Sequence, residues 1–424
     1  MAVSKKLTGT ILSISLLTVM AGAAIAPALG IIKQHFSGAP DILIQMIVSM
    51  PALFIIITNL LFPIISRKFD TRTIAVTGLL MYVIFGCGAF FATSLTMLLI
   101  LRALLGISVG LIMPLSTGLL NYYYPPEEQA GLMGLSAAMN QMGGVVATLL
   151  AGLLAGVNWN YAFLVYAIGL IAVVLVMLYL PAEHIGKARV KPSDLSADEM
   201  AKAEVAIESV EPIGDIKVPN GFFARLRRFH PSVVGMLLLM IIFFVYPTNF
   251  AIAAHSQTSL SNDAITIIMV GLDVVAFFVG LIFGWMMRTF RQQIKYMAPI
   301  LFFVGYLLMV LFQNATGLVA GSAVIGVANG LGVPYLNTIA SIKAGRSAAT
   351  TVMPLLSISL YLGQFISPLI VLPLGKLLFG TNDISAPFKV ACIFALLFLV
   401  QVICTRHFQS LPPEMRRAMR KGGR

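Results

Sequence analysis

Two ionisable side chains stand inside long apolar stretches of the 424-residue sequence, where chemistry would proceed away from water. Asp273 is the acidic residue in such a position; the other 15 of the 16 acids lie in polar segments or at the ends of apolar stretches. A lone carboxylate in hydrocarbon is costly when charged, so its neutral form is favoured. We therefore expect Asp273 to bind and release a coupling proton. The alternative is a neutral acid that is hydrogen-bonded to a neighbouring helix.

Arg102 is the basic residue inside such a stretch. A buried guanidinium could attract an anionic substrate, assist proton transfer, or bond to helix carbonyls while its stem follows apolar surface. If Arg102 and Asp273 neutralise each other, single and double neutral variants should show non-additive losses of transport.

Uncharged polar side chains near the middle of other apolar stretches are candidates for binding a ligand. Amides and phenols can orient a ligand without the desolvation cost of an ion. The alternative is that they hydrogen-bond one helix to another. They are Asn140, Gln141, Tyr246, Asn249, Asn329, Tyr335, Tyr361 and Gln364, with Met113 and Phe277 as an adaptable apolar wall or as ordinary packing.

The composition indicates that lipid surrounds most of these residues. Charged residues make up 10% of the chain, against roughly a quarter in a soluble domain, and hydrophobic residues make up 59%. These values exclude an ordinary cytosolic enzyme. Twelve apolar runs reach the length of about 20 residues that a membrane helix needs. They lie near 8–31, 42–66, 74–93, 96–121, 129–155, 160–181, 232–254, 263–287, 296–314, 317–341, 349–373 and 387–407.

The basic residues predict how the chain crosses the membrane. Of the 28 Lys and Arg, 24 fall in the termini and in the loops on the same side, and three fall in the opposite loops. This bias predicts a multi-pass protein of the plasma membrane with both termini in the cytoplasm. The net charge of +12 is thus a topology signal, which favours contact with anionic membrane lipids and no nucleic acid.

An internal repeat divides the chain into two halves. Five special backbone residues return 220 positions later: Pro27, Gly106, Gly110, Pro114 and Gly143 reappear as Pro247, Gly326, Gly330, Pro334 and Gly363. Six spans per half give both halves the same orientation, and in such parallel repeats a substrate binds between the halves near the middle of the membrane. We predict a six-helix bundle at 1–181, a charged cytoplasmic linker at 182–231, and a second six-helix bundle with a basic tail at 232–424. The four prolines should kink their helices.

These residues resemble the major facilitator superfamily over nearly the whole chain. The fourth span keeps the pattern Leu-x-x-x-Arg-x-x-x-Gly at Leu98, Arg102 and Gly106. "APAL" at 26–29 resembles the first span of the twelve-span drug:proton antiporter branch, and "WNYAF" at 159–163 resembles the entry to span six. The resemblance implies a secondary transporter with spans one, four, seven and ten around the cavity and spans two, five, eight and eleven at its sides.

Two family motifs are altered. The loop after span two usually reads Gly-x-x-x-Asp-Arg-x-Gly-Arg-Arg and latches the halves at the cytoplasmic face. Here the loop offers Arg67, Asp70 and Arg72, with Arg288 at the corresponding place of the second half, as the gating residues. The antiporter motif of span five, Gly-x-x-x-Gly-Pro-x-x-Gly-Gly, survives from Gly143 to Gly152 with Thr148 in place of the proline.

The sequence therefore predicts a monomeric secondary transporter that works by alternating access and exports amphipathic organic compounds in exchange for protons. Uptake or exchange of an organic anion through Arg102 is the first alternative, and a lipid flippase or a non-transporting sensor is the second. We expect no cofactor, no metal and no enzymatic activity. The three cysteines lack metal-ligand spacing, and no phosphate-binding loop of a primary pump is present in the sequence.

Overall fold

The computed structural model describes residues 5–124, 126–182, 222–290, 293–344, 346–380 and 383–406. Twelve helical segments in these ranges are long and apolar enough to cross a bilayer, which confirms the predicted all-α membrane fold. The first six spans are α1 (Lys5–Ala23) with η1 (Ala26–Ala28) and α2 (Leu29–His35), α3 (Asp41–Lys68), α4 (Thr71–Gly88) with η2 (Ala89–Phe91), α5 (Leu95–Tyr123), α6 (Pro126–Val157), and η3 (Trp159–Ile168) with α7 (Gly169–Tyr179). The second six are α9 (Phe222–Gln257), α10 (Asn262–Phe290), α11 (Ile294–Leu311), α12 (Ala315–Ala344), α13 (Arg346–Phe379) and α14 (Ala386–Cys404).

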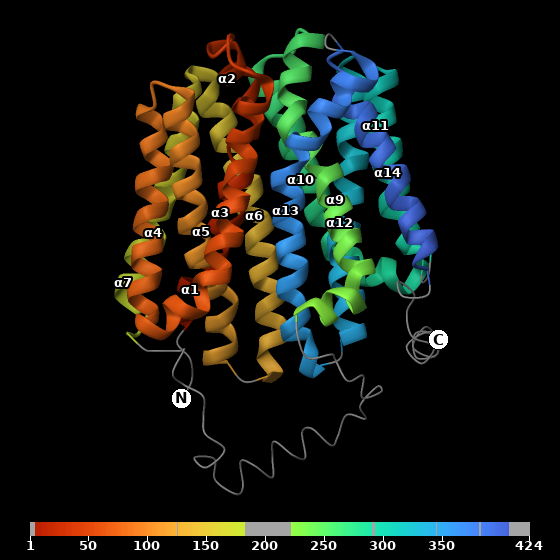
Figure 1. Ribbon diagram of the computed structural model, residues 1–424. Coiled ribbons are helices and arrows are strands. Elements are labelled where there is room, and N and C mark those ends of the chain that lie inside the picture. The colour runs from red at the N-terminus through yellow and green to blue at the C-terminus, as the bar shows by residue number, and fades with distance from the viewer. Residues whose placement is uncertain are drawn as a thin grey trace, which may run out of the picture.

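The helices form two bundles that stand side by side in Figure 1, with α1–α7 on the left and α9–α14 on the right. An even number of crossings brings Lys5 and Cys404 to the same end of the molecule, which we call the inner end; the opposite end is the outer end. The predicted linker at 182–231 falls largely outside the described residues, as does the basic tail after 406. Helix α9 begins at Phe222, inside the range predicted for the linker.

The outside of the bundles is apolar. Large hydrophobic side chains that point away from the helix contacts include Leu60, Ile84, Leu170, Ile171, Leu178, Phe278, Leu281 and Trp285. Soluble monomers rarely expose so much contiguous apolar surface. Hydrocarbon chains of lipid are the natural cover for it.

Repeat-related glycines make equivalent contacts in the two halves. Gly106 of α5 fits against the backbone of Pro51 in α3, and a β-carbon at Gly326 of α12 would lie 2.7 Å from the carbonyl oxygen of Leu272 in α10. Such close approach of two helices is a common way to pack in a membrane, where dispersion contacts replace the hydrophobic effect. The repeat read from the sequence thus describes real packing.

Span one departs from the prediction of a simple proline kink. Pro114, Pro247 and Pro334 lie inside continuous helices, whereas α1 ends at Ala23 and the 3₁₀ turn η1 follows around Pro27. Proline lacks an N–H group and cannot continue the helical hydrogen bonds. Beside this break, the side chains of Arg102 and Tyr166 bond the carbonyl oxygen of Ala21, in the last turn of α1.

Candidate functional site

Helices α6 and α10 meet between the halves along a close contact that we call the outer seam. It consists of Thr148 and Gly152 on α6 with Asn262, Thr266 and Asp273 on α10. Gly152 lies directly against the Thr266 side chain, and Asn262 Nδ2 donates to the carbonyl oxygen of Gly152 at 2.7 Å. Because Thr148 and Gly152 are four residues apart, they share one face of α6.

Asp273 marks the deep end of this seam. It lies roughly 16 Å along α10 from Asn262, about halfway through a hydrocarbon core of about 30 Å. Thr148 Oγ1 donates a hydrogen bond of 3.1 Å to Asp273 Oδ2. The bond joins the two halves.

Arg102 is fully engaged within the first half. Its side chain is 1% exposed, and its Nε donates to the carbonyl oxygen of Ile47 at 2.7 Å. Nη1 donates to Tyr166 Oη and Nη2 to the carbonyl oxygen of Ala21, both at 2.6 Å. The Ala21 carbonyl belongs to the last turn of α1, where the helix leaves its acceptors unpaired. The guanidinium therefore holds the broken first span against α3, α5 and η3.

Several predicted ligand residues do lie where the halves meet. Asn249 Oδ1 accepts from Gln45 Nε2 at 2.6 Å, which joins α9 to α3. Tyr361 Oη of α13 lies 3.2 Å from Met113 Sδ of α5. Gln364 of α13 packs beside Gly22 of α1, whose added β-carbon would lie 3.1 Å from its Nε2.

The remaining candidates make contacts inside one half. Asn140 accepts from Thr18 at 2.7 Å, and Tyr246 Oη bonds Ser322 at 2.8 Å. Tyr335 belongs to an apolar cluster of α10, α11 and α12, and Phe277 packs edge-on against Phe278. Gln141 and Asn329 are half-buried, and the Asn329 Oδ1 atom is buried without a hydrogen bond in the described part of the chain.

The predicted gating residues stand at the inner end. Asp70 caps α4 by accepting from the Thr73 amide at 2.9 Å, and Arg72 bonds the carbonyl oxygen of Met177. Both contacts stay in the first half. Arg67 and Arg288 are exposed at the inner ends of α3 and α10. Their latching role stays a prediction.

Ion pairs of the described residues lie at the outer end of the molecule. Asp41 at the start of α3 pairs with Lys33 of the same half and lies 4.0 Å from Lys376 Nζ of α13 in the other half. Gly30 of α2 also lies directly against His255 of α9. Together with the outer seam, these contacts close the outer side between the bundles.

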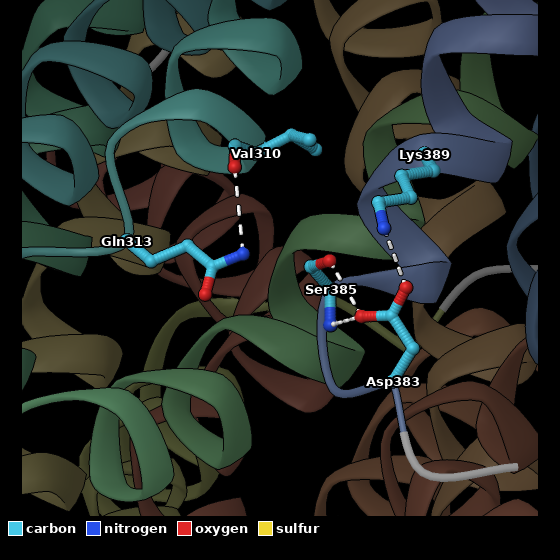
Figure 2. A network of polar contacts seen from close by, with 5 residues as sticks. All are labelled: Val310, Gln313, Asp383, Ser385 and Lys389. Carbon is cyan, nitrogen blue, oxygen red and sulfur yellow. Dashed lines mark hydrogen bonds and ion pairs between the residues drawn. The ribbon is translucent and has the colours of Figure 1, made fainter. Parts of the chain in front are cut away.

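A second polar network of the outer end lies at the start of α14, around Asp383. Figure 2 shows Asp383 between Ser385 and Lys389, near Gln313 and Val310. Lys389 Nζ donates to Asp383 Oδ2 at 2.6 Å, and the Ser385 amide and hydroxyl donate to Oδ1 at 2.9 and 2.6 Å. Burial alone would raise the pKa of Asp383, but these hydrogen bonds and the positive charge lower it below its ordinary value.

Sequence reasoning missed three residues that join the halves: Gln45, Thr148 and Asp41. Thr148 did carry a signal, because a polar residue stands where the family motif has proline. Gln45 is a lone amide in the outer part of a predicted span and could have been counted with the other amides. Asp41 lies at the end of an apolar stretch, where sequence gives no reason to prefer one lysine partner over another.

The fold and this site define a multi-pass membrane protein made of two like-oriented six-helix bundles that touch through polar groups at mid-membrane. The model of the Major Facilitator Superfamily matches residues 11–368. The chain belongs to this family, whose fold is that of transporters.

Solved structures share this fold across nearly the whole chain. A bacterial homologue of the human lysosomal transporter Spinster, in an inward-facing and occupied conformation, has a TM-score of 0.73 and 15% identity and covers 96% of this chain and 98% of its own. A POT family transporter in complex with a thioalcohol-conjugated peptide has a TM-score of 0.71 and 15% identity and covers 95% and 96%. At this identity the likeness shows the fold alone.

A curated relative matches part of the sequence. The hexuronate transporter of Bacillus subtilis (strain 168) is 23% identical over 230 residues, which is 54% of this chain and 51% of the relative. The match thus spans about half of each protein. The predicted relation to the drug:proton antiporter branch is not among these findings and stays a prediction.

Proposed function

We propose that this protein is a proton-coupled secondary transporter that exports small amphipathic organic compounds from the cytoplasm by alternating access. The observation that carries the proposal is the position of Asp273. It is an acid halfway along a membrane helix, and its hydrogen bond to Thr148 crosses from one bundle to the other. A group that gains and loses a proton at this junction can tie proton movement to the movement of the halves.

The contacts at the outer side support a state in which the substrate enters from the inner side. Asp41 with Lys376, Gln45 with Asn249, and the outer seam join the bundles there. In the transport cycle the halves rock, these contacts break, and Asp273 meets outside water. The basic loops at the inner end support the cytoplasm as the inner side and the plasma membrane as its location.

The test uses purified protein in vesicles with an imposed pH gradient. A thermal-shift screen of cationic, anionic and neutral amphiphiles at two pH values first selects compounds that bind. We expect a compound that binds to cross the membrane in the direction opposite to that of the protons. Its movement should stop when a proton uncoupler is added. Asp273→Asn should abolish this movement, whereas Asp263→Asn, an exposed acid at the outer end of the same helix, should retain it. Full proton-driven movement with Asp273→Asn would contradict the proposal.

Uptake of an organic anion is the second candidate, and the partial likeness to a hexuronate transporter favours it. In that case anionic compounds would shift the thermal transition, and accumulation inside cells would fall with the uncoupler rather than rise. The environment of Arg102 weighs against it, because an anion would have to replace three existing hydrogen-bond acceptors.

A further inference from the structure

The hydroxyl group of Thr148 has an unusual position for a threonine inside a membrane helix. Such hydroxyls commonly bond a carbonyl one turn earlier in their own helix, as Thr266 Oγ1 does with the carbonyl oxygen of Asn262 at 2.8 Å. Thr148 instead reaches across the seam to Asp273, although its side chain is only 2% exposed. Among the described residues it is the hydrogen-bond partner of that carboxylate.

A closed seam and an open seam should hold the Asp273 proton with different strength. In the closed seam one hydroxyl is too little to replace the hydration of a carboxylate, so the neutral acid is favoured. When the seam opens, water solvates the ionised form and the proton leaves. If closure of the seam raises the affinity of Asp273 for a proton by some factor, protonation of Asp273 must raise the closed-to-open ratio by the same factor.

Among the described residues around Asp273, Thr148 is the one that hydrogen-bonds its carboxyl group, so it can influence whether the acid is neutral or ionised. Helix α12 presents Gly326 and Gly330 to the α10 segment that carries Asp273, and α9 presents Tyr246. In the described part of the chain, the ion pairs lie elsewhere, at Lys33–Asp41, Lys376–Asp41 and Lys389–Asp383.

We propose that Thr148 is a positioning residue that stabilises the closed outer seam and weakens the dependence of closure on the protonation of Asp273. It supports both forms of the acid across the closed seam and supports the ionised form more, because hydrogen bonds to charged groups are stronger. Thr148 thereby limits how strongly pH shifts the seam. This inference rests on the proposed function in taking Asp273 as the proton carrier.

The experiment measures the seam directly, without substrate. Exposed Val157 at the outer end of α6 and exposed Ile267 on α10 are replaced by cysteine and spin-labelled, in a background in which Cys87, Cys392 and Cys404 are alanine. Distances between the labels are recorded for the full chain in lipid nanodiscs over a pH series. We expect the short distance of the closed seam to dominate at low pH and to decline as pH rises.

Four substitutions separate the effect of the Thr148 hydroxyl from the effect of packing. Asp273→Asn should keep the seam closed at every pH. Thr148→Val keeps the side-chain volume and should reduce the closed-to-open ratio by about fivefold at low pH and about twentyfold at high pH, so that the pH response becomes larger. Thr148→Ser should restore the wild-type curve. Thr266→Val is the matched control, since its hydroxyl bonds its own helix, and it should leave the pH response unchanged.

A wild-type curve for Thr148→Val, or the same change for Thr266→Val, would overturn the role proposed for Thr148. This experiment and the vesicle assay can fail independently. If solute movement needs Asp273 while the seam does not respond to pH, the role of Thr148 is wrong and the proposed function stands. If the seam responds to pH through Asp273 and responds more strongly in Thr148→Val, but no proton-driven solute movement occurs, the role of Thr148 stands and the proposed function is wrong.

Discussion

A single methyl group at Gly152 should prevent the outer seam from closing fully. The added β-carbon would lie directly against Oγ1 and Cγ2 of Thr266, and 2.7 Å from its Cβ. Thr266 is completely buried on α10, so it has little space to move away. Such overpacking costs about 2 kcal/mol in a well-packed site. The cost applies only while α6 and α10 touch.

The open state avoids this clash, so the whole penalty acts on the equilibrium between the two states. A difference of about 2 kcal/mol corresponds to a change of about thirtyfold in the closed-to-open ratio. Gly152→Ala should therefore lengthen the distance between labels at positions 157 and 267 at a pH where the wild type is closed. Export should slow as well, because the inward-facing state that loads substrate becomes rare.

Gly134→Ala is the matched control on the same helix. A β-carbon at Gly134 has nothing within 4 Å, so this variant should keep the wild-type label distance. Adding Thr266→Ala to Gly152→Ala removes two of the three crowded atoms and should recover part of the closed population. An unchanged distance in Gly152→Ala would refute the close contact between α6 and α10.

Three further predictions concern the charged groups. Arg102→Lys should lower the temperature of thermal unfolding by removing two of three buried hydrogen bonds, worth about 1 kcal/mol each. This shift should add to that of Asp273→Asn because the two residues share no partner; a large departure from additivity would restore the idea that they neutralise each other. Asp41→Asn should reduce the closed population about twofold by removing the ion pair with Lys376, and wild-type closure should weaken in high salt while that of the variant does not. Asp383→Asn should destabilise the protein by about 0.5 kcal/mol at neutral pH. Because folding lowers the pKa of Asp383, its stabilising effect is present above the ordinary pKa of an aspartate and is lost as pH falls through the lowered pKa. The unfolding temperatures of the wild type and the variant should therefore converge in acid.

The sequence predicted the fold because its signals are carried by many residues at once. Twelve long apolar runs, a repeat offset of 220 and the pattern at Leu98, Arg102 and Gly106 rarely arise together by chance. The glycines show why the repeat was informative. Gly106 allows α5 to approach α3 closely, and Gly326 allows α12 to approach α10 in the same way. The same packing therefore requires glycine at the same place in both halves.

The candidate site was predicted less completely because its partners are specific atoms on distant helices. Arg102 illustrates this limit, since two of its three acceptors are backbone carbonyls of Ile47 and Ala21, which any residue type supplies. Tyr246 and Asn140 were chosen for their depth, but depth does not say towards which neighbour a helix face turns. Asp273 could be singled out from sequence alone, because acids are rare inside membrane-spanning stretches; its role as a proton carrier stays a proposal.

The two halves hold the backbone of their first spans with different chemistry: α1 ends before Pro27, whereas α9 continues through Pro247. The carbonyl oxygen of Ala21 and its repeat partner, that of Ile241, both precede a proline and both accept from side chains of other helices. Arg102 and Tyr166 supply the bonds in the first half, while Ser367 and Tyr306 bond Ile241 and Ile242 in the second.

A buried guanidinium that lost its acceptors would be left as an uncompensated charge, which is far more costly than a hydroxyl that loses one bond. The first span is therefore held rigidly against its own half. Span seven, held by neutral hydroxyls, can change its bend at lower cost. Asp273 belongs to that same second half. Under the proposed function, a proton that binds Asp273 would act on the half whose first span is held by neutral hydroxyls rather than by a buried charge.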